Sequence, residues 1–338
     1  MTFDFSGYRI GNRGYSEKPM TILDPEPKAV LSTVMEIAMI ETCSRSAREH
    51  WQQIQLRNLV NHAIQRSAFW RSRIGRRRAS DIDLAALPIL TRQDLRTQVA
   101  SEGALLRATD GLSTKAHATS GSSGVPVKFF ISDVNTNYNS IRSLAQYFLE
   151  GRDLSLNRTR VGYTPVKGGI SVEKKESWIG SLGKLIKSGA NKEINYFPFS
   201  REIYQKLVRK IMQDDVGYLV CGPWTMDAIF SSFDLNFLKA AKTAMWIPQG
   251  EQVNPKLLEA FASLAIPVLG SYSSEEVGVI GAECRKFPSH YHVATSNVIV
   301  ETIDHKSDVD GMKLGKVLVT HLHSYAAPFI RYGIHRGL

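Results

Sequence analysis

Residues 119–124 read Thr119-Ser120-Gly121-Ser122-Ser123-Gly124, and Val125, Pro126 and the mostly apolar run 127–131 follow them. Two glycines let the backbone turn tightly and approach a ligand closely. Four hydroxyl groups lie among backbone N–H groups, and concave turns of such N–H groups bind anions. The stretch therefore predicts a phosphate chain as ligand, although a Ser/Gly hexapeptide taken alone is more often a plain linker.

The residues that follow this loop exclude the P-loop class of phosphate site. The Walker motif needs Gly-Lys-Ser/Thr and then a helix, whereas here Val127, Phe129 and Ile131 alternate as in a strand. We expect a phosphate-binding loop between strands, on a fold other than that of the P-loop NTPases. The Gly-x-Ser-x-Gly spacing of a hydrolase nucleophile is also missing from the loop.

Length and composition are those of an ordinary globular protein. The 338 residues are 43% hydrophobic and 22% charged, which suits two domains or one large domain. No apolar run reaches the ~18 residues of a membrane span, and the first residues show no signal-peptide pattern. Cys43, Cys221 and Cys284 are few and widely spaced. They predict a reduced compartment, the cytoplasm, and no disulfide framework.

The net charge of +10 is partly concentrated in five arginines, which are Arg71, Arg73, Arg76, Arg77 and Arg78. A nucleic-acid patch is one interpretation, and a solvated loop after a helix is the other. No aromatic residues alternate with these arginines as a single-strand platform would need, so we favour the loop and expect no nucleic-acid partner. A positive field also attracts ATP, coenzyme A or an acidic carrier protein.

The pattern along the chain divides it into three regions. Residues 1–47 form an N-terminal extension, irregular apart from an apolar stretch at 30–40; residues 48–290 form an α/β core; and residues 291–338 form an antiparallel β subdomain. In the core, Thr91 is a good helix N-cap with Asp94 three residues later. Residues 162–189 are rich in Gly and Lys and predict a long loop over a site.

Beyond Tyr196 short apolar strands and helices alternate, which predicts a mostly parallel sheet covered by helices. The expected helices are 48–69, 135–149, 202–212, one opening at 223, and 255–264; the expected core strands are 218–221, 244–247 and 266–269. From Tyr291 the pattern changes to two antiparallel strands, 298–303 and 316–320, joined by a charged turn.

Two polar segments directly follow expected strands. Gln249-Gly250-Glu251 follows strand 244–247, and Gly270-Ser271-Tyr272-Ser273-Ser274-Glu275-Glu276 follows strand 266–269. Open α/β sheets bind ligands at the carboxyl ends of their strands. Tyr272 could stack on a planar base, and the two glutamates could hold a divalent cation that bridges phosphates. A solvated helix start is the alternative interpretation of two adjacent glutamates.

Taken together, these segments resemble the adenylate-forming acyl ligases, and most of all the phenylacetate–coenzyme A ligase branch with its capsule-biosynthesis relatives. The resemblance covers about residues 48–332. Four family motifs occur in the family order, namely Thr-Ser-Gly-Ser/Thr-Thr-Gly at 119–124, Gly-Gly-Glu at 249–251 with one glycine replaced, Tyr-Gly-x-Ser-Glu-Val at 272–277, and Gly-x-x-x-Val-Thr with Pro-x-Ile-Arg-Tyr at 315–320 and 328–332.

The resemblance implies the fold and the chemistry of the large N-terminal domain of such an enzyme. That domain is α/β, with mostly parallel helix-covered sheets and a small antiparallel β subdomain. The implied cofactors are ATP or AMP and Mg²⁺, with the 119–124 loop on the phosphates, Thr119 and Glu276 in catalysis, Tyr272 on adenine and Glu276 on the metal. The remaining implied nucleotide-binding residues are Gly250, Glu251, Gly270, Ser271, Ser273 and Ser274.

The implied reaction has two steps. A small carboxylic acid attacks ATP to give an acyl-adenylate, and the thiol of coenzyme A or of an acyl carrier protein then displaces AMP. The acid pocket expected from the sequence includes Tyr163, Trp224 and Gly250, with Phe230 as a further aromatic candidate, although aromatic residues at such positions are more often core. Lys167 and Lys174 could meet the acid or the phosphates.

The sequence also departs from the family pattern. An Asp that accepts hydrogen bonds from the ribose aligns with Arg336, which cannot accept one, and Val125 stands where relatives often have Lys. Relatives carry a further C-terminal domain of roughly 100 residues, a typical domain size. A fragment, a partner domain supplied by another chain, and a non-catalytic binding homologue all remain open. Cys284, His290 and His292 form an incomplete zinc pattern.

Overall fold

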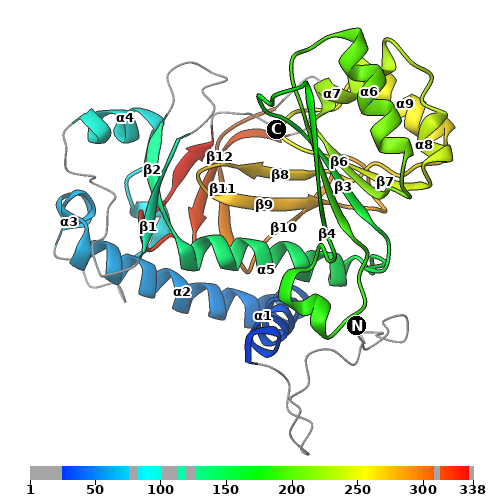
Figure 1. The fold of residues 1–338 in the computed structure, drawn as a ribbon. Coiled ribbons are helices and arrows are strands. Elements are labelled where there is room, and N and C mark those ends of the chain that lie inside the picture. Colours follow the sequence, from blue (N-terminus) through cyan, green and yellow to red (C-terminus); the bar gives the residue numbers. More distant parts are fainter. Residues whose placement is uncertain (1–24, 76–81, 101–112, 119–126, 308–312, 335–338) are drawn as a thin grey trace, which may run out of the picture. The chain divides into compact units, whose positions relative to one another are not determined.

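The computed structural model describes residues 25–75, 82–100, 113–118, 127–307 and 313–334. By its internal contacts the chain forms two compact units (Figure 1). Unit 1 contains residues 1–35, 146–271 and 282–291, and unit 2 contains residues 36–145, 272–281 and 292–338. This division differs from the one expected from the sequence, because the chain enters each unit more than once. Helices α1 (Pro25–Thr42) and α5 (Asp133–Leu149) contribute residues to both units.

Unit 1 is built on a five-stranded sheet with the order β4-β5-β3-β6-β7. The strands are β3 (Arg158–Tyr163), β4 (Ile170–Lys175), β5 (Asn191–Tyr196), β6 (Gly217–Cys221) and β7 (Thr243–Pro248). Four of them run parallel, and β4 pairs antiparallel with β5 at one edge. The expected mostly parallel sheet is therefore confirmed.

Both faces of this sheet are buried, as parallel strands require. Successive residues of β6 alternate between the two faces. Leu219 and Cys221 join the core formed with helices α6 (Arg201–Met212), α7 (Pro223–Phe230), α8 (Phe237–Ala240) and α9 (Pro255–Ser263), which gather beside the sheet in Figure 1. Tyr218 and Val220 pack on the opposite face with Met245. Burial raises the pKa of the Cys221 thiol to about 12, so this cysteine is an inert core residue.

Unit 2 combines helices with three small sheets. Its helices are α2 (Arg45–Arg66), α3 (Ala68–Ile74), η2 (Leu84–Ala86) and α4 (Arg92–Ala100). Its first sheet pairs β1 (Thr114–Ala118) with β2 (Lys128–Ser132). The second contains β8 (Ser271–Ser274), β9 (Gly278–Glu283) and β10 (Tyr291–Val293), and each of these three strands includes one or two residues of unit 1. The third contains β11 (Val298–Ser307), β12 (Lys313–His321) and β13 (Tyr332–Ile334). One large apolar core joins these elements, with Trp70, Leu90 and Ile330 at 0% exposure.

Local signals in the sequence place several of these elements correctly. The Thr91 hydroxyl accepts from Asp94 N at 3.0 Å, and Asp94 Oδ2 accepts from Thr91 N at 2.7 Å, so the N-cap is a reciprocal capping box. Burial would raise the pKa of Asp94, but the hydrogen bonds from Thr91 and the Arg73 guanidinium together lower it. The antiparallel pair β11 and β12 is also confirmed, with Val300 opposite Val319.

Three expectations about elements are wrong. Residues 162–189 are not a long loop, because they contain β4 and the short helix η3 (Gly180–Lys184); β4 is an edge strand whose exposed side chains leave no apolar alternation to read. Residues 266–269 contribute only one bridge, Val268 to Trp246, because Pro267 has no N–H for a ladder. Residues 25–42 are helical, with prolines confined to the first turn.

Within the described residues, the arginine cluster is represented by Arg71 and Arg73. Arg71 and Arg73 lie on α3, where Arg71 Nε donates to Ile64 O at 3.0 Å and Arg73 Nη2 donates to Ile89 O at 3.0 Å. These two side chains therefore bind the protein's own backbone, which corrects the loop expectation for them. Arg76, Arg77 and Arg78 lie outside the described residues.

In the described ranges no helix is both long and apolar enough to cross a membrane.

Candidate functional site

The expected phosphate loop connects the two strands of a hairpin in unit 2. β1 and β2 pair antiparallel, and their last described pair before the connection is Ala118 with Lys128. The strands that we expected on both sides of the loop are therefore confirmed. The loop residues Thr119, Ser120, Gly121, Ser122, Ser123 and Gly124 themselves, with Val125, lie outside the described residues.

The second motif forms strand β8 and the turn that follows it, not the start of a helix. Glu275, Glu276 and Val277 make this turn between β8 and β9. Val277 N donates to Ser274 Oγ at 3.3 Å, and Gly278 takes φ +68°, a value at which a side chain would be strained. The turn belongs to a separate three-stranded sheet, which corrects the expectation that it ends a strand of the parallel sheet.

The buried side-chain amide of Asn297 hydrogen-bonds to the backbone of this turn. Asn297 is 0% exposed, and its Nδ2 donates to Val277 O at 3.3 Å and to Val279 O at 2.9 Å. Because both acceptors flank Gly278, Asn297 fixes the backbone of the turn that carries Glu276. No feature of the sequence pointed to this residue.

The β1–β2 hairpin contacts the same turn near the end of β1. His117 lies one residue before the end of β1, and its Nε2 donates to Glu275 Oε2 at 2.8 Å. The two residues are 158 positions apart in the sequence. The fold therefore brings the end of strand β1 to the first of the two adjacent glutamates.

A third motif contacts Glu276. Tyr332 donates its hydroxyl to Glu276 Oε1 at 3.0 Å. Burial, together with the negative charge of Glu276, raises the pKa of Tyr332, so the phenol keeps its proton and remains a donor. Arg92 and Arg96, one turn apart on α4, are close enough to oppose that rise in pKa.

The neighbouring residue Arg331 has a structural role. Its side chain is 7% exposed, and Nη1 donates to Ala85 O at 2.7 Å while Nε donates to Glu301 Oε2 at 3.1 Å. It adopts φ +51°, a conformation that costs energy for a residue with a side chain. Arg331 thus ties the last described strand to η2 and β11, and Arg336, the residue aligned with the ribose Asp, lies outside the described residues.

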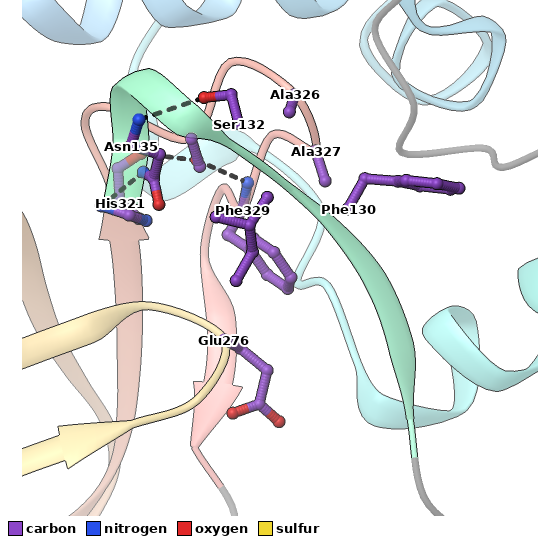
Figure 2. Close-up of a pocket in the computed structure, with 10 residues that line it drawn as sticks. Phe130, Ser132, Asn135, Glu276, His321, Ala326, Ala327 and Phe329 are labelled. Atoms are coloured by element: carbon purple, nitrogen blue, oxygen red, sulfur yellow. Dashed lines mark hydrogen bonds between the residues drawn. The ribbon is translucent and has the colours of Figure 1, made fainter. Parts of the chain in front are cut away.

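Glu276 also lies at the edge of a small pocket in unit 2 (Figure 2). The pocket encloses about 200 Å³, including space open to solvent, so it could hold only a small group. Its lining residues are Phe130, Ile131, Ser132, Asn135, Glu276, His321, Ser324, Ala326, Ala327 and Phe329. Burial, with a smaller effect of His323, lowers the pKa of His321 to about 3, so the imidazole is neutral at pH 7.

In unit 1, two expected pocket residues meet at the carboxyl edge of the parallel sheet. β3 pairs with β5 on one side and with β6 on the other, so the strands that follow β3 in the sequence are added first on one side of it and then on the other. Open α/β sheets bind ligands at such a topological switch point. Tyr163 ends β3, and its ring centroid lies 5.3 Å from that of Trp224, in the first turn of α7 after β6.

A third aromatic ring completes this cluster. Phe199 stacks on Tyr163 at 4.1 Å and 12°, and meets Trp224 edge-on at 4.6 Å. Tyr163 and Phe199 are 40% and 49% exposed, an unusual exposure for stacked rings. Phe199 is not part of the pocket expected from the sequence, although it belongs to an aromatic run, residues 196–199, at the end of strand β5. Lys174 does not join the cluster, because it pairs with Asp214 at 2.9 Å.

Four further expected ligand residues, Gly250, Glu251, Gly270 and Ser271, lie in unit 1. Gly250 and Glu251 follow β7 after one intervening residue and are exposed. Gly250 takes φ +94° in open space, so its conformation rather than crowding favours glycine. Gly270 donates its N–H to Glu283 Oε2 at 2.9 Å, and Ser271 starts β8. Tyr272 and Ser273 follow in unit 2, where Tyr272 packs partly buried against the core.

The described residues fit Mg²⁺ and do not form a zinc site. Among them, no three His, Cys, Asp or Glu side chains gather as they would around a metal ion. Cys284 is buried and its N–H donates to His290 O. A single carboxylate such as Glu276 suits Mg²⁺, which proteins commonly hold with one or two carboxylates while nucleotide phosphates and water supply the remaining ligands.

Comparison with known proteins identifies the fold. No family model and no curated protein matches the chain. An open conformation of 2-hydroxyisobutyryl-CoA ligase, in complex with 2-HIB-AMP and CoA, is similar with a TM-score of 0.63 and 16% identity over 87% of this chain and 70% of that chain. The same ligase in its thioesterification state gives 0.62 and 16% over 97% and 70%.

A postadenylation structure of that ligase with R3-HIB-AMP gives a TM-score of 0.61 and 16% identity, and this chain covers 64% of its length. At such low identity the likeness shows a shared fold. The chain therefore has the mixed α/β fold of the acyl-CoA ligases, as the sequence motifs predicted.

Proposed function

We propose that this chain is the adenylating part of an acid–thiol ligase. It would activate a small carboxylic acid with ATP and Mg²⁺ as an acyl-adenylate and pass the acyl group to the thiol of coenzyme A or of an acyl carrier protein. Within that class we propose the phenylacetate–coenzyme A ligase branch, on the four motifs described above. Solved ligases with this fold hold an acyl-adenylate and CoA, which supports the proposal.

One observation carries the proposal. In unit 2 the end of strand β1, the turn with Glu276 and Tyr332 meet, through the His117–Glu275 and Tyr332–Glu276 hydrogen bonds. A magnesium-bound nucleotide needs both phosphate-binding groups and a carboxylate, and we propose that residues 119–124, which follow β1 in the sequence, act together with Glu276. The positive charges of Arg92 and Arg96 lower the pKa of Tyr332, and positive charge of this kind would also favour a bound phosphate group.

The proposed roles rest on the sequence motifs that these residues form. Residues Thr119 to Gly124 bind the phosphates, and Tyr272 with Gly270, Ser271, Ser273 and Ser274 binds the base and sugar. Glu276 would hold the Mg²⁺, which, when bound, neutralises charge on the phosphate oxygens. Gly250 and Glu251 line the nucleotide or acid side. Tyr163 and Trp224 form the apolar wall for the acid, together with Phe199.

The proposed reaction exchanges bonds in two steps, and the thiol of the acceptor enters the second step as its thiolate after losing its proton to solvent. A carboxylate oxygen of the acid forms a bond to the α-phosphorus, and the bond from that phosphorus to the bridging oxygen of pyrophosphate breaks. In the second step a thiolate sulfur bonds to the acyl carbon and AMP leaves. The residues named above position the reactants and stabilise charge, and none forms a covalent intermediate.

A pyrophosphate-exchange assay over a panel of acids tests this proposal. The panel contains aromatic and short aliphatic acids, and the assay is run on this chain alone and with a C-terminal ligase domain supplied in trans. Acid-dependent exchange in either form supports adenylation. Saturable ATP binding without exchange in both forms would instead favour a non-catalytic homologue that acts as a binding protein. Neither exchange nor ATP binding would remove the proposal.

A further inference from the structure

The ring cluster at the carboxyl edge of the sheet in unit 1 is filled by one of its own side chains. The ring of Phe199 lies parallel to that of Tyr163, with centroids 4.1 Å apart and planes at 12°, and meets Trp224 edge-on at 4.6 Å and 85°. Trp224 also meets Tyr163 edge-on, at 5.3 Å. Aromatic pairs are ordinarily spaced by about 4.5–7 Å, so no further ring fits between any two of these three.

Two of the three rings are held in place. Tyr163 is the last residue of β3 and pairs with Tyr196 in β5. Trp224 lies against Gly222, where a Cβ atom would come within 3.2 Å of the indole Nε1, although the backbone of Gly222, at φ −67°, would accept most residues. The glycine therefore serves the close approach of the indole. The next residue, Thr225, is hydrogen-bonded to the buried hydroxyl of Tyr196 at 2.9 Å.

The third ring, that of Phe199, is the most exposed of the cluster. It lies in the irregular segment 197–200 between β5 and α6, and 49% of the residue is exposed. Exposed side chains change rotamer rapidly, and the contacts with two neighbouring rings oppose the departure of this one. Contacts of this kind correspond to a factor of about ten in an equilibrium constant.

We propose that Phe199 occupies the place of the substrate's ring in the empty site and thereby determines which acids enter it. An acid with a planar ring would turn the Phe199 side chain out to solvent and stack on Tyr163 in its place, edge-on to Trp224. An acid without a flat ring cannot replace the lost stacking contact and would be rejected. This role rests on the proposed function, which places the acid at these rings, and it assigns the selection among acids to one residue.

The sign of one mutational effect tests this role. Binding of phenylacetate, and of cyclohexylacetate, which is of similar size but has no flat ring, is measured by calorimetry without nucleotide. Because Phe199 no longer has to leave, Phe199→Ala should bind phenylacetate up to about tenfold more tightly than the wild type. Its preference for phenylacetate over cyclohexylacetate should shrink. Weaker or unchanged binding of phenylacetate would overturn the role, because a fixed wall loses contacts when it is truncated.

The matched control is Phe287→Ala. Phe287 is also an exposed phenylalanine of unit 1, and its ring contacts His290 rather than the cluster. Both acids should bind Phe287→Ala as they bind the wild type. A gain in phenylacetate affinity as large as that of Phe199→Ala would overturn the role, because it would not depend on the cluster.

A second measurement reports where the ring of the ligand lies. In protein labelled with fluorinated tryptophan, the fluorine NMR signal of Trp224 is assigned by its loss in Trp224→Phe. A neighbouring aromatic ring shifts this signal, so Phe199→Ala should move it. Phenylacetate added to Phe199→Ala should return the signal towards its wild-type position, and cyclohexylacetate should not. A signal that phenylacetate leaves unmoved at saturation would overturn the replacement of one ring by the other.

The possible failures are distinguishable. If no acid of the exchange panel binds either the wild type or Phe199→Ala, the acid pocket is absent, and the proposed function falls together with this role. If the wild type binds phenylacetate and Phe199→Ala binds it no more tightly, only the role of Phe199 is overturned, and the adenylation proposal stands. Binding in Phe199→Ala alone would support the role, because the wild-type ring would then exclude the acid.

Discussion

Replacing Tyr332 by Phe removes one oxygen atom from the centre of the candidate site. The Tyr332 side chain is 2% exposed, and its ring stays packed against Phe329 in the variant, so no cavity of note is created. The change therefore isolates the hydrogen bond from the Tyr332 hydroxyl to Glu276 Oε1, at 3.0 Å.

The magnitude follows from the kind of acceptor. A hydrogen bond to a charged group contributes about 1.5–3 kcal/mol, and one between neutral groups about 0.5–1.5 kcal/mol. Tyr138→Phe is a matched control in the same unit, because the Tyr138 hydroxyl donates to a neutral acceptor, Ser296 O, at 2.9 Å. Since Glu276 is only half-buried, we expect the Tyr332→Phe loss near the lower end, about 1.5 kcal/mol, and still above that of Tyr138→Phe.

The assay is urea unfolding of a double-mutant cycle. Tyr332→Phe is measured in the wild type and in Glu276→Ala, where the acceptor is already missing. We expect the cost of Tyr332→Phe to fall to a few tenths of a kcal/mol in the second background, because the two changes remove the same bond. An equal cost in both backgrounds would refute the reasoning, since the hydroxyl would then stabilise the fold without Glu276.

Three further predictions concern other parts of the chain. Glu41 Oε1 accepts from Ser296 N at 3.0 Å and from Ser296 Oγ at 2.6 Å, and lies 3.7 Å from Nη2 of the buried Arg142. Because Glu41→Ala leaves the buried guanidinium without this carboxylate, it should lower the free energy of unfolding, measured in urea, by about 3–5 kcal/mol. Glu41→Gln should lower it by less. His321 has a pKa of about 3 in the folded protein and an ordinary pKa of about 6.5 when unfolded, so between these pH values the unfolded state binds more protons. The free energy of unfolding should therefore fall as the pH drops below about 6.5, by at most about 1.4 kcal/mol per pH unit. Urea titrations at several pH values should show that His321→Gln lacks this part of the pH dependence. Trp224→Ala removes one wall of the exposed ring cluster and should raise the Kd of an aromatic acid by tenfold or more while changing that of a short aliphatic acid little, as measured by calorimetry; equal losses for both acids would contradict an aromatic pocket.

Elements with local signals could be predicted from the sequence. The capping box of Thr91 and Asp94 depends on only four consecutive residues, and the structure has the expected reciprocal hydrogen bonds. Helices α6, α7 and α9 and strands β6 and β7 combine apolar periodicity with Pro, Gly or Ser at their ends. The parallel order of the sheet then follows from the alternation of strand and helix.

Elements that depend on contacts with residues distant in the sequence could not be predicted. β4 has mostly exposed side chains and exists because β5 offers it a partner. Residues 266–269 look like a strand by their apolar character, but Pro267 limits their pairing to one bridge. Propensity describes the residue itself, whereas pairing depends on the neighbour that the fold supplies.

The same distinction applies to the candidate site. Glycines, serines and glutamates mark the motifs, so Glu276, Tyr163 and Trp224 could be proposed from the sequence. The residues that hold these groups carry no such mark. His117 meets Glu275 across 158 positions and Tyr332 meets Glu276 across 56. Residues of this kind become visible only when the contacts are known, because their side-chain types are common in any core or surface.

Calorimetric titration of ATP tests the central claim most directly. The wild type is titrated with and without Mg²⁺, and Glu276→Gln is titrated under the same conditions. The account predicts saturable binding of one ATP, tightened by Mg²⁺, and a loss of at least about tenfold in the Mg²⁺-dependent affinity in Glu276→Gln, which corresponds to about 1.4 kcal/mol. ATP binding that is absent, or equally strong without Mg²⁺ and in Glu276→Gln, would contradict the assignment of this loop and this carboxylate to a magnesium-bound nucleotide.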